Sequence, residues 1–295
     1  ISLGLVGSEM CIRDRTWVNK LSEDIFKLWK NKIEIIIVTS GAIAIGCKYL
    51  KISRKNLKLK EYQAVSAIGQ IELINLFKKS LSKKKINIGQ ILLTLEDTEN
   101  RRRALNAKDT IENIFKLKGV PVVNENDTTA TNEIRYGDND RLAARVAQIT
   151  SSDTLVMLSD IDGLYTKDPK KFKNAEHIRT VKTITDKILK SASKSVTDYG
   201  SGGMITKIEA AKICMASGCR MILTKGSVIN PLSKLEKEKF CTVFIPNTNK
   251  YNAKKKWIRS SIKNKGSIIV DDGAKNALIK GCLLYTSPSP RDPTK

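Results

Sequence analysis

Short apolar runs alternate along this chain with longer segments of helical periodicity, and this alternation constrains the fold more than any other feature. The runs are of strand length, at Ile33–Val38, Gln90–Thr94, Val120–Val123, Thr154–Leu158 and Arg220–Leu223. Helical patterns occupy other segments, as at Trp17–Trp29, Glu61–Leu81 and Arg101–Lys118. Strands that alternate with helices at these lengths favour a parallel sheet covered on both faces. The predicted fold is therefore α/β, a three-layer sandwich with a mainly parallel central sheet.

A dense polar stretch, VVNENDTTATNEIRYGDND at Val122–Asp140, follows one of these runs. Unpaired polar side chains cannot continue into a dry core, so Asn124–Asp127 are expected at the carboxyl end of a strand. The second cluster, Gly137–Asp140, suits the start of the helical pattern that follows it. Ligands of open α/β sheets bind at this edge, and the two clusters suit a small zwitterion. Each cluster alone is also typical of ordinary turns and caps.

Two further segments have the composition of anion sites. Ser40 and Gly41 stand between a strand and a helix, where a hydroxyl and backbone amides would face an anion, although many such turns bind no ligand. The segment GSGGMITK at Gly200–Lys207 opens another helix. Its glycines let the backbone approach phosphate, and Lys207 adds a positive charge one turn inside. This segment does not match the Walker pattern.

The formal charge of +23 raises the possibility of nucleic-acid binding. Its lysines are spread through helices and loops, which favours a solvated basic surface and makes nucleic acid a less favoured partner. With 41% hydrophobic residues in 295, the chain can form one large domain or two smaller ones. No apolar run is long enough to cross a bilayer and no export signal is recognised, so no membrane association and a cytoplasmic location are expected.

The six cysteines form no C-x-x-C pair, and His177 is the single histidine. Neither a zinc site nor a disulfide framework is expected, and no metal ligand is assigned to the chain. The cysteines are expected to be reduced and mostly buried. His177 is expected at the surface, near the start of a strand.

Seven motifs in this order resemble the glutamate 5-kinases, which belong to the amino acid kinase family. They are IVTSGAIA at Ile37–Ala44, SAIGQ at Ser66–Gln70, LNAKDT at Leu105–Thr110, VNENDTTAT at Val123–Thr131, YGDND at Tyr136–Asp140, SDIDGLYTKDP at Ser159–Pro169 and GSGGMITK at Gly200–Lys207. The resemblance covers nearly all of Thr16–Gly281. The pairing of NEND with GDND distinguishes it from the aspartate, acetylglutamate and uridylate kinases of the same fold.

The resemblance implies ATP-dependent phosphorylation of the glutamate side-chain carboxylate, as in proline biosynthesis. It implies glutamate-binding roles for Ser40, Asp127 and Asn139. It also implies ATP-binding roles for a second set of residues: Ser159, Asp160, Ser201, Gly202, Gly203, Met204, Ile205, Thr206 and Lys207. Lys207 is the expected catalytic cation, Asp140 is a candidate for orienting it, and Mg²⁺ would bridge the phosphates. A homo-oligomer and feedback inhibition by proline are also implied.

Both ends of the chain depart from this pattern. Residues 1–15 and 282–295 resemble translated sequencing-adapter sequence and are expected to be non-native flanks. Residues 16–265 would be a kinase domain without its first strand and without the family's second phosphate-binding lysine. Residues 266–281 resemble the start of a truncated PUA-like domain. Two alternatives remain open, a basic RNA-binding protein and a related kinase acting on another acidic amino acid.

Overall fold

A computed structural model describes residues 2–4, 15–54, 57–130, 138–169, 171–193, 203–238, 240–248, 252 and 270–279. The chain divides into two compact units, Ile1–Ser261 and Ile262–Lys295. The first unit contains the sheet and all of the predicted site residues. Of the second unit the structure describes helix α12, Asp272–Ile279. The native or non-native origin of the terminal residues and the PUA-like assignment remain predictions.

The main sheet of the first unit has the strand order β3-β4-β2-β1-β5-β9-β10-β8 among the described residues. Every neighbouring pair is parallel except β9 and β10, which are antiparallel. Its strands are β1 Ser2–Gly4, β2 Ile36–Val38, β3 Ile88–Leu93, β4 Val120–Glu125, β5 Thr154–Ser159, β8 Thr180–Val181, β9 Arg220–Lys225 and β10 Thr242–Phe244. A separate antiparallel pair joins β6 Leu164–Tyr165 to β7 His177–Ile178. The predicted α/β class with a mainly parallel sheet is confirmed.

The first strand corrects one expectation. We expected the kinase domain to lack its first strand, yet Ser2–Gly4 pairs in parallel with β2 on one side and with β5 on the other. A strand inside a parallel sheet is covered on both faces and shows no alternation of apolar and polar residues. Local sequence patterns therefore do not mark Ser2–Gly4 as a strand, and only its pairing with β2 and β5 shows it.

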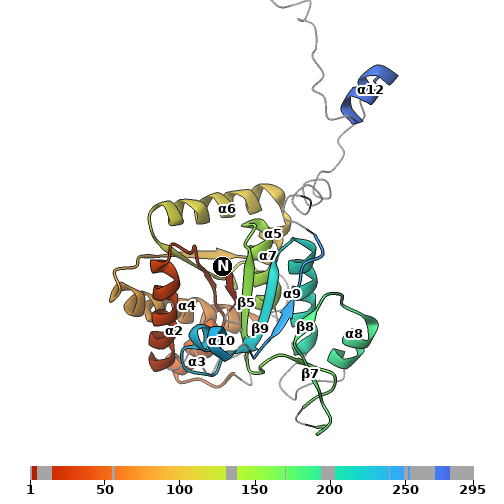
Figure 1. Cartoon of the computed structure of the whole chain (residues 1–295). Helices are drawn as coiled ribbons and strands as arrows, with labels where there is room; N and C mark the ends of the chain where they lie inside the picture. The colour runs from red at the N-terminus through yellow and green to blue at the C-terminus, as the bar shows by residue number, and fades with distance from the viewer. Residues whose placement is uncertain are drawn as a thin grey trace, which may run out of the picture. The chain divides into compact units, whose positions relative to one another are not determined.

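Helices cover both faces of the sheet, and Figure 1 shows the two groups on opposite sides of the strands. One group consists of α2 Arg15–Lys30, α3 Ala42–Leu50, α4 Leu59–Ser82 and α10 Pro231–Glu238. The other consists of α5 Leu95–Glu99, α6 Arg101–Lys116, α7 Asp138–Ile149, α8 Asp186–Ser193 and α9 Met204–Ala216. Each group forms its own hydrophobic core against the strands. This arrangement is the predicted three-layer sandwich.

Helix α2 illustrates how the sequence produces these layers. Its apolar residues Val18, Leu21 and Ile25 recur at helical spacing, and all three are fully buried against the sheet. Burial of each such side chain contributes about 1.5–3 kcal/mol relative to leaving it in water. Lys27 and Lys30 lie in its last turn, where a positive charge complements the helix dipole.

Two glycines allow α3 and α4 to approach each other closely. A Cβ on Gly69 would lie 1.9 Å from the carbonyl oxygen of Ala42, and a Cβ on Gly46 would lie 2.2 Å from that of Val65. No other residue type fits at either position without moving the backbone. The contact fixes α3, and with it the β2–α3 turn that carries Ser40.

Four cysteines of the described residues, Cys47, Cys214, Cys219 and Cys241, are buried, as predicted. The hydrogen bond with Cys219 and burial both raise the pKa of Cys214 well above its ordinary value, so this thiol stays protonated. None of the described helices combines the length and the apolar composition that crossing a membrane requires.

His177 begins strand β7, as expected, but its side chain is half-buried instead of lying open at the surface. Its ring stacks on Phe240 with centroids 4.7 Å apart and meets the edge of Tyr165 at 5.0 Å. Both ring nitrogens are buried and have no hydrogen-bond partner in the described parts of the chain. The β6–β7 pair folds back so that this ring packs beside Gly163, and no local pattern around position 177 indicates that contact.

Candidate functional site

The predicted site residues gather at one edge of the sheet. Strands β2, β4, β5 and β9 run in parallel, so their carboxyl ends share this edge. Helices that follow or precede such strands begin at the same edge. Ser40 and Asp127 follow β2 and β4, Ser159 ends β5, and Asn139 and Lys207 lie in the first turns of α7 and α9.

At the end of β2, the chain turns into α3 through Ser40 and Gly41. The Thr39 amide donates to the carbonyl oxygen of Val123 over 2.8 Å, which ties this turn to β4. Gly41 adopts the left-handed backbone conformation, with φ 92°, and stands at the N-cap of α3. The first amides of α3 point out of the start of the helix, toward the sheet edge, and Gly41 offers no side chain to cap them. Ser40 is buried beside them.

Helix α4 holds the polar loop that follows β4. The Ser66 hydroxyl makes a short hydrogen bond to Oδ2 of Asp127. Gln70 donates to the Glu125 carbonyl oxygen over 3.2 Å, and Gln63 donates to that of Ala130 over 3.1 Å. Positions 63, 66 and 70 share one face of the helix. Three polar side chains therefore fix the conformation of the loop and the direction of the Asp127 carboxylate.

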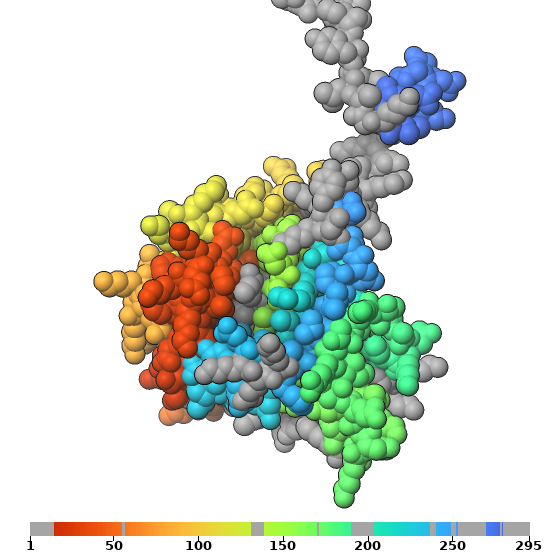
Figure 2. Space-filling view, in the orientation of Figure 1, coloured from red at the N-terminus to blue at the C-terminus, as the bar shows by residue number. Residues whose placement is uncertain are grey.

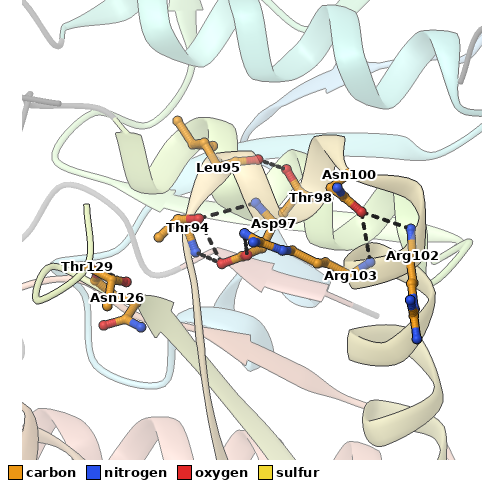
Figure 3. Close-up of polar contacts among 9 residues, drawn as sticks. All are labelled: Thr94, Leu95, Asp97, Thr98, Asn100, Arg102, Arg103, Asn126 and Thr129. Carbon is orange, nitrogen blue, oxygen red and sulfur yellow. Dashed lines mark hydrogen bonds and ion pairs between the residues drawn. The ribbon is translucent and has the colours of Figure 1, made fainter. Parts of the chain in front are cut away.

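Figure 3 shows the neighbouring junction, where β3 ends and α5 and α6 begin. Oδ2 of Asp97 accepts from the amide and the hydroxyl of Thr94, while Asn100 caps α6 by accepting from the amides of Arg102 and Arg103. Burial pushes the pKa of Asp97 up, but hydrogen bonds from Thr94 and Arg103 outweigh burial and hold this pKa below its ordinary value. The Asn126 amide donates to the Leu93 carbonyl oxygen over 3.0 Å, which joins this capped junction to the β4 loop.

Asp140 and Lys207 form a buried ion pair between α7 and α9. Nζ of Lys207 lies 3.2 Å from Oδ2 of Asp140, and their side chains are 8% and 0% exposed. The hydroxyl of Thr206 also donates to Oδ2 of Asp140, over 2.7 Å. A lysine in the first turn of a helix adds its charge to the positive end of the dipole, and Lys207 does so at the start of α9. Asp140 orients Lys207 and offsets part of that charge.

The end of β5 is tied to the end of β9. Ser159 is buried and its hydroxyl donates to Oδ1 of Asp160, which is exposed. The Gly226 amide donates to the Ser159 carbonyl oxygen over 2.6 Å. A Cβ on Gly226 would lie 2.9 Å from the Cβ of Leu158, so the backbone approaches this closely only with glycine present.

Three acceptor oxygens at this edge are buried and have no hydrogen-bond partner within the described part of the chain: Oδ1 of Asn124, Asn139 and Asp140. A buried acceptor without a donor costs about 1–3 kcal/mol. A ligand ammonium, or water bound to a cation, would satisfy such oxygens. The set therefore fits the amino acid and magnesium chemistry predicted from the sequence.

Not every predicted residue can be placed. Ser201 and Gly202 lie outside the described residues, while Gly203, Met204, Ile205 and Thr206 form the start of α9. Sequence reasoning did not select Gln63, Ser66 and Gln70 as site residues. Their spacing on one face of an otherwise amphipathic helix was the available signal.

A sequence model described as the amino acid kinase family matches residues 5–225. The chain is therefore of a phosphoryl-transfer enzyme class, and the backbone amides and Lys207 at the start of α9 suit phosphate groups. Among solved structures, carbamate kinase from Giardia lamblia bound to AMP-PNP has a TM-score of 0.58 at 13% identity and covers 83% of this chain and 98% of its own. UMP kinase from Ureaplasma parvum has a TM-score of 0.51 at 19% identity, and the match covers 83% of this chain and 97% of the UMP kinase chain. These two structures support the fold.

Curated relatives narrow the class further. Glutamate 5-kinase of Pelagibacter ubique (strain HTCC1062) is 57% identical over 287 residues, which is 96% of this chain and 78% of that protein. Glutamate 5-kinase of Paramagnetospirillum magneticum (strain AMB-1) is 47% identical over 285 residues, or 95% and 77% of the two chains. The chain therefore belongs to the glutamate 5-kinases of the amino acid kinase family.

Proposed function

We propose that this protein transfers the γ-phosphoryl group of ATP to the side-chain carboxylate of L-glutamate. The product is glutamyl 5-phosphate, and the reaction is the first step of proline biosynthesis. The observation that carries the proposal is the buried Asp140–Lys207 pair at the sheet edge of a chain whose relatives are glutamate 5-kinases. No comparison favours RNA binding or another acidic substrate.

Lys207 is the catalytic cation of the proposed reaction. A glutamate carboxylate is already nucleophilic, so the protein needs no general base and must instead align two anions and neutralise the transferred phosphoryl group. The ammonium of Lys207 supplies that positive charge at the start of α9, where backbone amides add to it. Asp140 holds this ammonium in place through Oδ2.

Ser40, Asp127 and Asn139 form the proposed glutamate side. The Asp127 carboxylate suits a substrate ammonium, and Ser66 fixes its direction. Oδ1 of Asn139 and of Asn124, acceptors without a partner among the described residues, fit the same ammonium. The Ser40 hydroxyl and the first amides of α3 suit a substrate carboxylate.

Ser159, Asp160 and residues 201–207 form the proposed ATP side. Strand β5 ends at Ser159, opposite Lys225 of β9, and Asp160 follows it. The start of α9 offers amides and Lys207 to phosphate oxygens. Mg²⁺ would be held mainly by these phosphates, with the unpaired Oδ1 of Asp140 accepting from metal-bound water, and would neutralise phosphate charge. No described group of three or more His, Cys, Asp or Glu residues could hold an ion by itself.

A homo-oligomer, inhibition by proline and a cytoplasmic location belong to the same proposal. Exposed apolar side chains on the packed helices α3 and α4, among them Tyr49 and Ile71, support self-association. Proline inhibition follows from the place of the reaction in proline synthesis, and the use of ATP agrees with the cytoplasm. Light scattering of the chain and of Ile71→Lys tests the first of these, because a charge at 71 should lower the association.

The proposed activity is tested by trapping the acyl phosphate with hydroxylamine. The hydroxamate should form with L-glutamate and ATP, and L-aspartate and N-acetylglutamate should give little product. Lys207→Ala should lower kcat by about 10²- to 10³-fold, whereas Lys212→Ala, an exposed lysine on the same helix, should not change it. Equal turnover of aspartate, or full activity of Lys207→Ala, would contradict the proposal.

A further inference from the structure

Helix α2 holds the loop that leaves β9 at the nucleotide side of the sheet edge. Trp17 is buried, and its indole N–H donates to the Gly226 carbonyl oxygen over 2.7 Å. The amide of the same Gly226 donates to the carbonyl oxygen of Ser159. One glycine therefore connects the first turn of α2 to the last residue of β5.

The same helix also caps α10, where this loop ends. Oδ2 of Asp24 accepts from the amides of Leu232 and Ser233 over 3.0 and 3.2 Å. Its other oxygen accepts from the Ser233 hydroxyl and from the side chain of Asn230. A carboxylate at the first amides of a helix complements its dipole. Asp24 performs this capping from a helix about two hundred positions earlier in the sequence.

Trp17 and Asp24 lie seven residues apart and therefore project from one face of α2. Figures 1 and 2 show α2 and α10 side by side. The two contacts hold both ends of the segment from Gly226 to Leu232. The strand register places Lys225 opposite Ser159, so this segment begins directly beside the residues that would bind ATP.

We propose that Trp17 and Asp24 are positioning residues for nucleotide binding, which hold the loop 226–232 and, through the Gly226 amide, the end of β5. This inference rests on the proposed function, in which Ser159 and Asp160 bind ATP. Neither side chain touches the nucleotide in this proposal. They hold the loop and the Ser159 carbonyl in one conformation before ATP binds. Less conformational entropy of the protein is then lost on binding, which favours ATP binding.

Trp17→Phe separates positioning from packing, because phenylalanine keeps a buried aromatic ring and removes only the indole N–H. The KM for ATP should rise about five- to tenfold, the effect of losing one buried hydrogen bond. The KM for glutamate and kcat should stay within about twofold. Trp29→Phe is the matched control, since Trp29 lies on the same helix and stacks on Phe26, and it should change none of these constants.

Hydrogen–deuterium exchange of the full chain without ligands gives a second readout that requires no activity. The amides of residues 226–230, 232 and 233 should exchange faster in Trp17→Phe and in Asp24→Asn, and should be unchanged in Trp29→Phe. If Trp17→Phe does not fold, Asp24→Asn provides the same measurements, because asparagine keeps the size and one acceptor oxygen.

Unchanged exchange in the loop would overturn the proposal, and so would equal increases in both KM values, which indicate a general loosening. Failure of the proposed function is distinguishable. If the unsubstituted chain forms no glutamyl hydroxamate, the kinase assignment fails, whereas the exchange experiment still decides whether Trp17 and Asp24 hold the loop.

Discussion

At the scale of single residues, Asp140 has the most demanding environment of the site. It is fully buried, one oxygen holds Lys207 and Thr206, and the other has no partner among the residues that the structure describes. Removing one member of a buried pair leaves an uncompensated charge in a low dielectric. The pair therefore constrains stability as well as activity.

Asp140→Ala should lower the free energy of unfolding by about 3–5 kcal/mol, because Lys207 would remain buried without its partner. The double variant Asp140→Ala/Lys207→Met should recover much of this loss, since no buried charge remains. Urea denaturation of the two single variants and the double variant measures the coupling. Additive losses would show that the two side chains do not interact energetically.

Asp97 gives a prediction about pH. Its pKa is lowered in the folded protein, so it stabilises the fold above its unfolded pKa of about 3.9, and this stability is lost as the pH falls through the folded value. Asp97→Asn should therefore be less stable than the unsubstituted chain at pH 7, by about 1 kcal/mol.

The difference in stability between Asp97→Asn and the unsubstituted chain should narrow below about pH 4, where the Asp97 carboxylate becomes protonated. Urea midpoints from pH 7 to pH 3.5 measure it. Asp109→Asn, at an exposed position on α6, serves as the control and should show a smaller difference at every pH. A gap between the Asp97 proteins that widens on acidification would contradict the role given to this carboxylate.

At the scale of secondary-structure elements, the α3–α4 contact links packing to the glutamate side of the site. Helix α4 carries Ser66 and Gln70 to the β4 loop, and α3 begins at the Ser40–Gly41 turn. Gly69 lets the two helices approach until a Cβ would strike the backbone of α3. The position of the β4 loop relative to the Ser40–Gly41 turn therefore depends on the distance between α3 and α4.

Gly69→Ala should lower the free energy of unfolding by about 1–3 kcal/mol, because the added methyl group must push α3 away. The same shift should raise the KM for glutamate more than the KM for ATP. Ala64→Gly, at an exposed position on α4, should lower stability by about 1 kcal/mol through helix propensity and leave both KM values unchanged. An unaltered KM for glutamate in Gly69→Ala would separate the helix contact from the site.

At the scale of the whole molecule, the formal charge of +23 is the dominant property. Like charges repel in the compact state, and salt screens this repulsion over a Debye length of about 10 Å at 0.1 M. The lysines include Lys83, Lys84 and Lys85, which follow α4 before β3. Their mutual repulsion favours the expanded state.

The thermal midpoint should therefore rise as NaCl increases from about 10 to 200 mM, because screening weakens the repulsion. A variant with Lys83, Lys84 and Lys85 changed to Gln should show a smaller rise. Calorimetry or circular dichroism measures both proteins. A midpoint that falls with salt would mean that attractive ion pairs, rather than net repulsion, dominate the surface electrostatics.

The sequence by itself determined the α/β class, because strand-length apolar runs and amphipathic helices are local patterns with different periods. It also placed Asp127, Asn139, Asp140 and Lys207 at strand ends and helix starts, since polar groups must leave a dry core there. The kinase assignment came from motifs in their order along the chain.

Only the tertiary structure decided which of these local elements meet. Ser66 reaches Asp127 across 61 positions, and Asp24 caps α10 across 208, through contacts that no neighbouring residues encode. The strand at Ser2–Gly4 and the packing of the His177 ring against Phe240 and Tyr165 were not predicted, for the same reason. Long-range contacts depend on how the helix faces and strand edges pack together, and local periodicity carries no record of that packing.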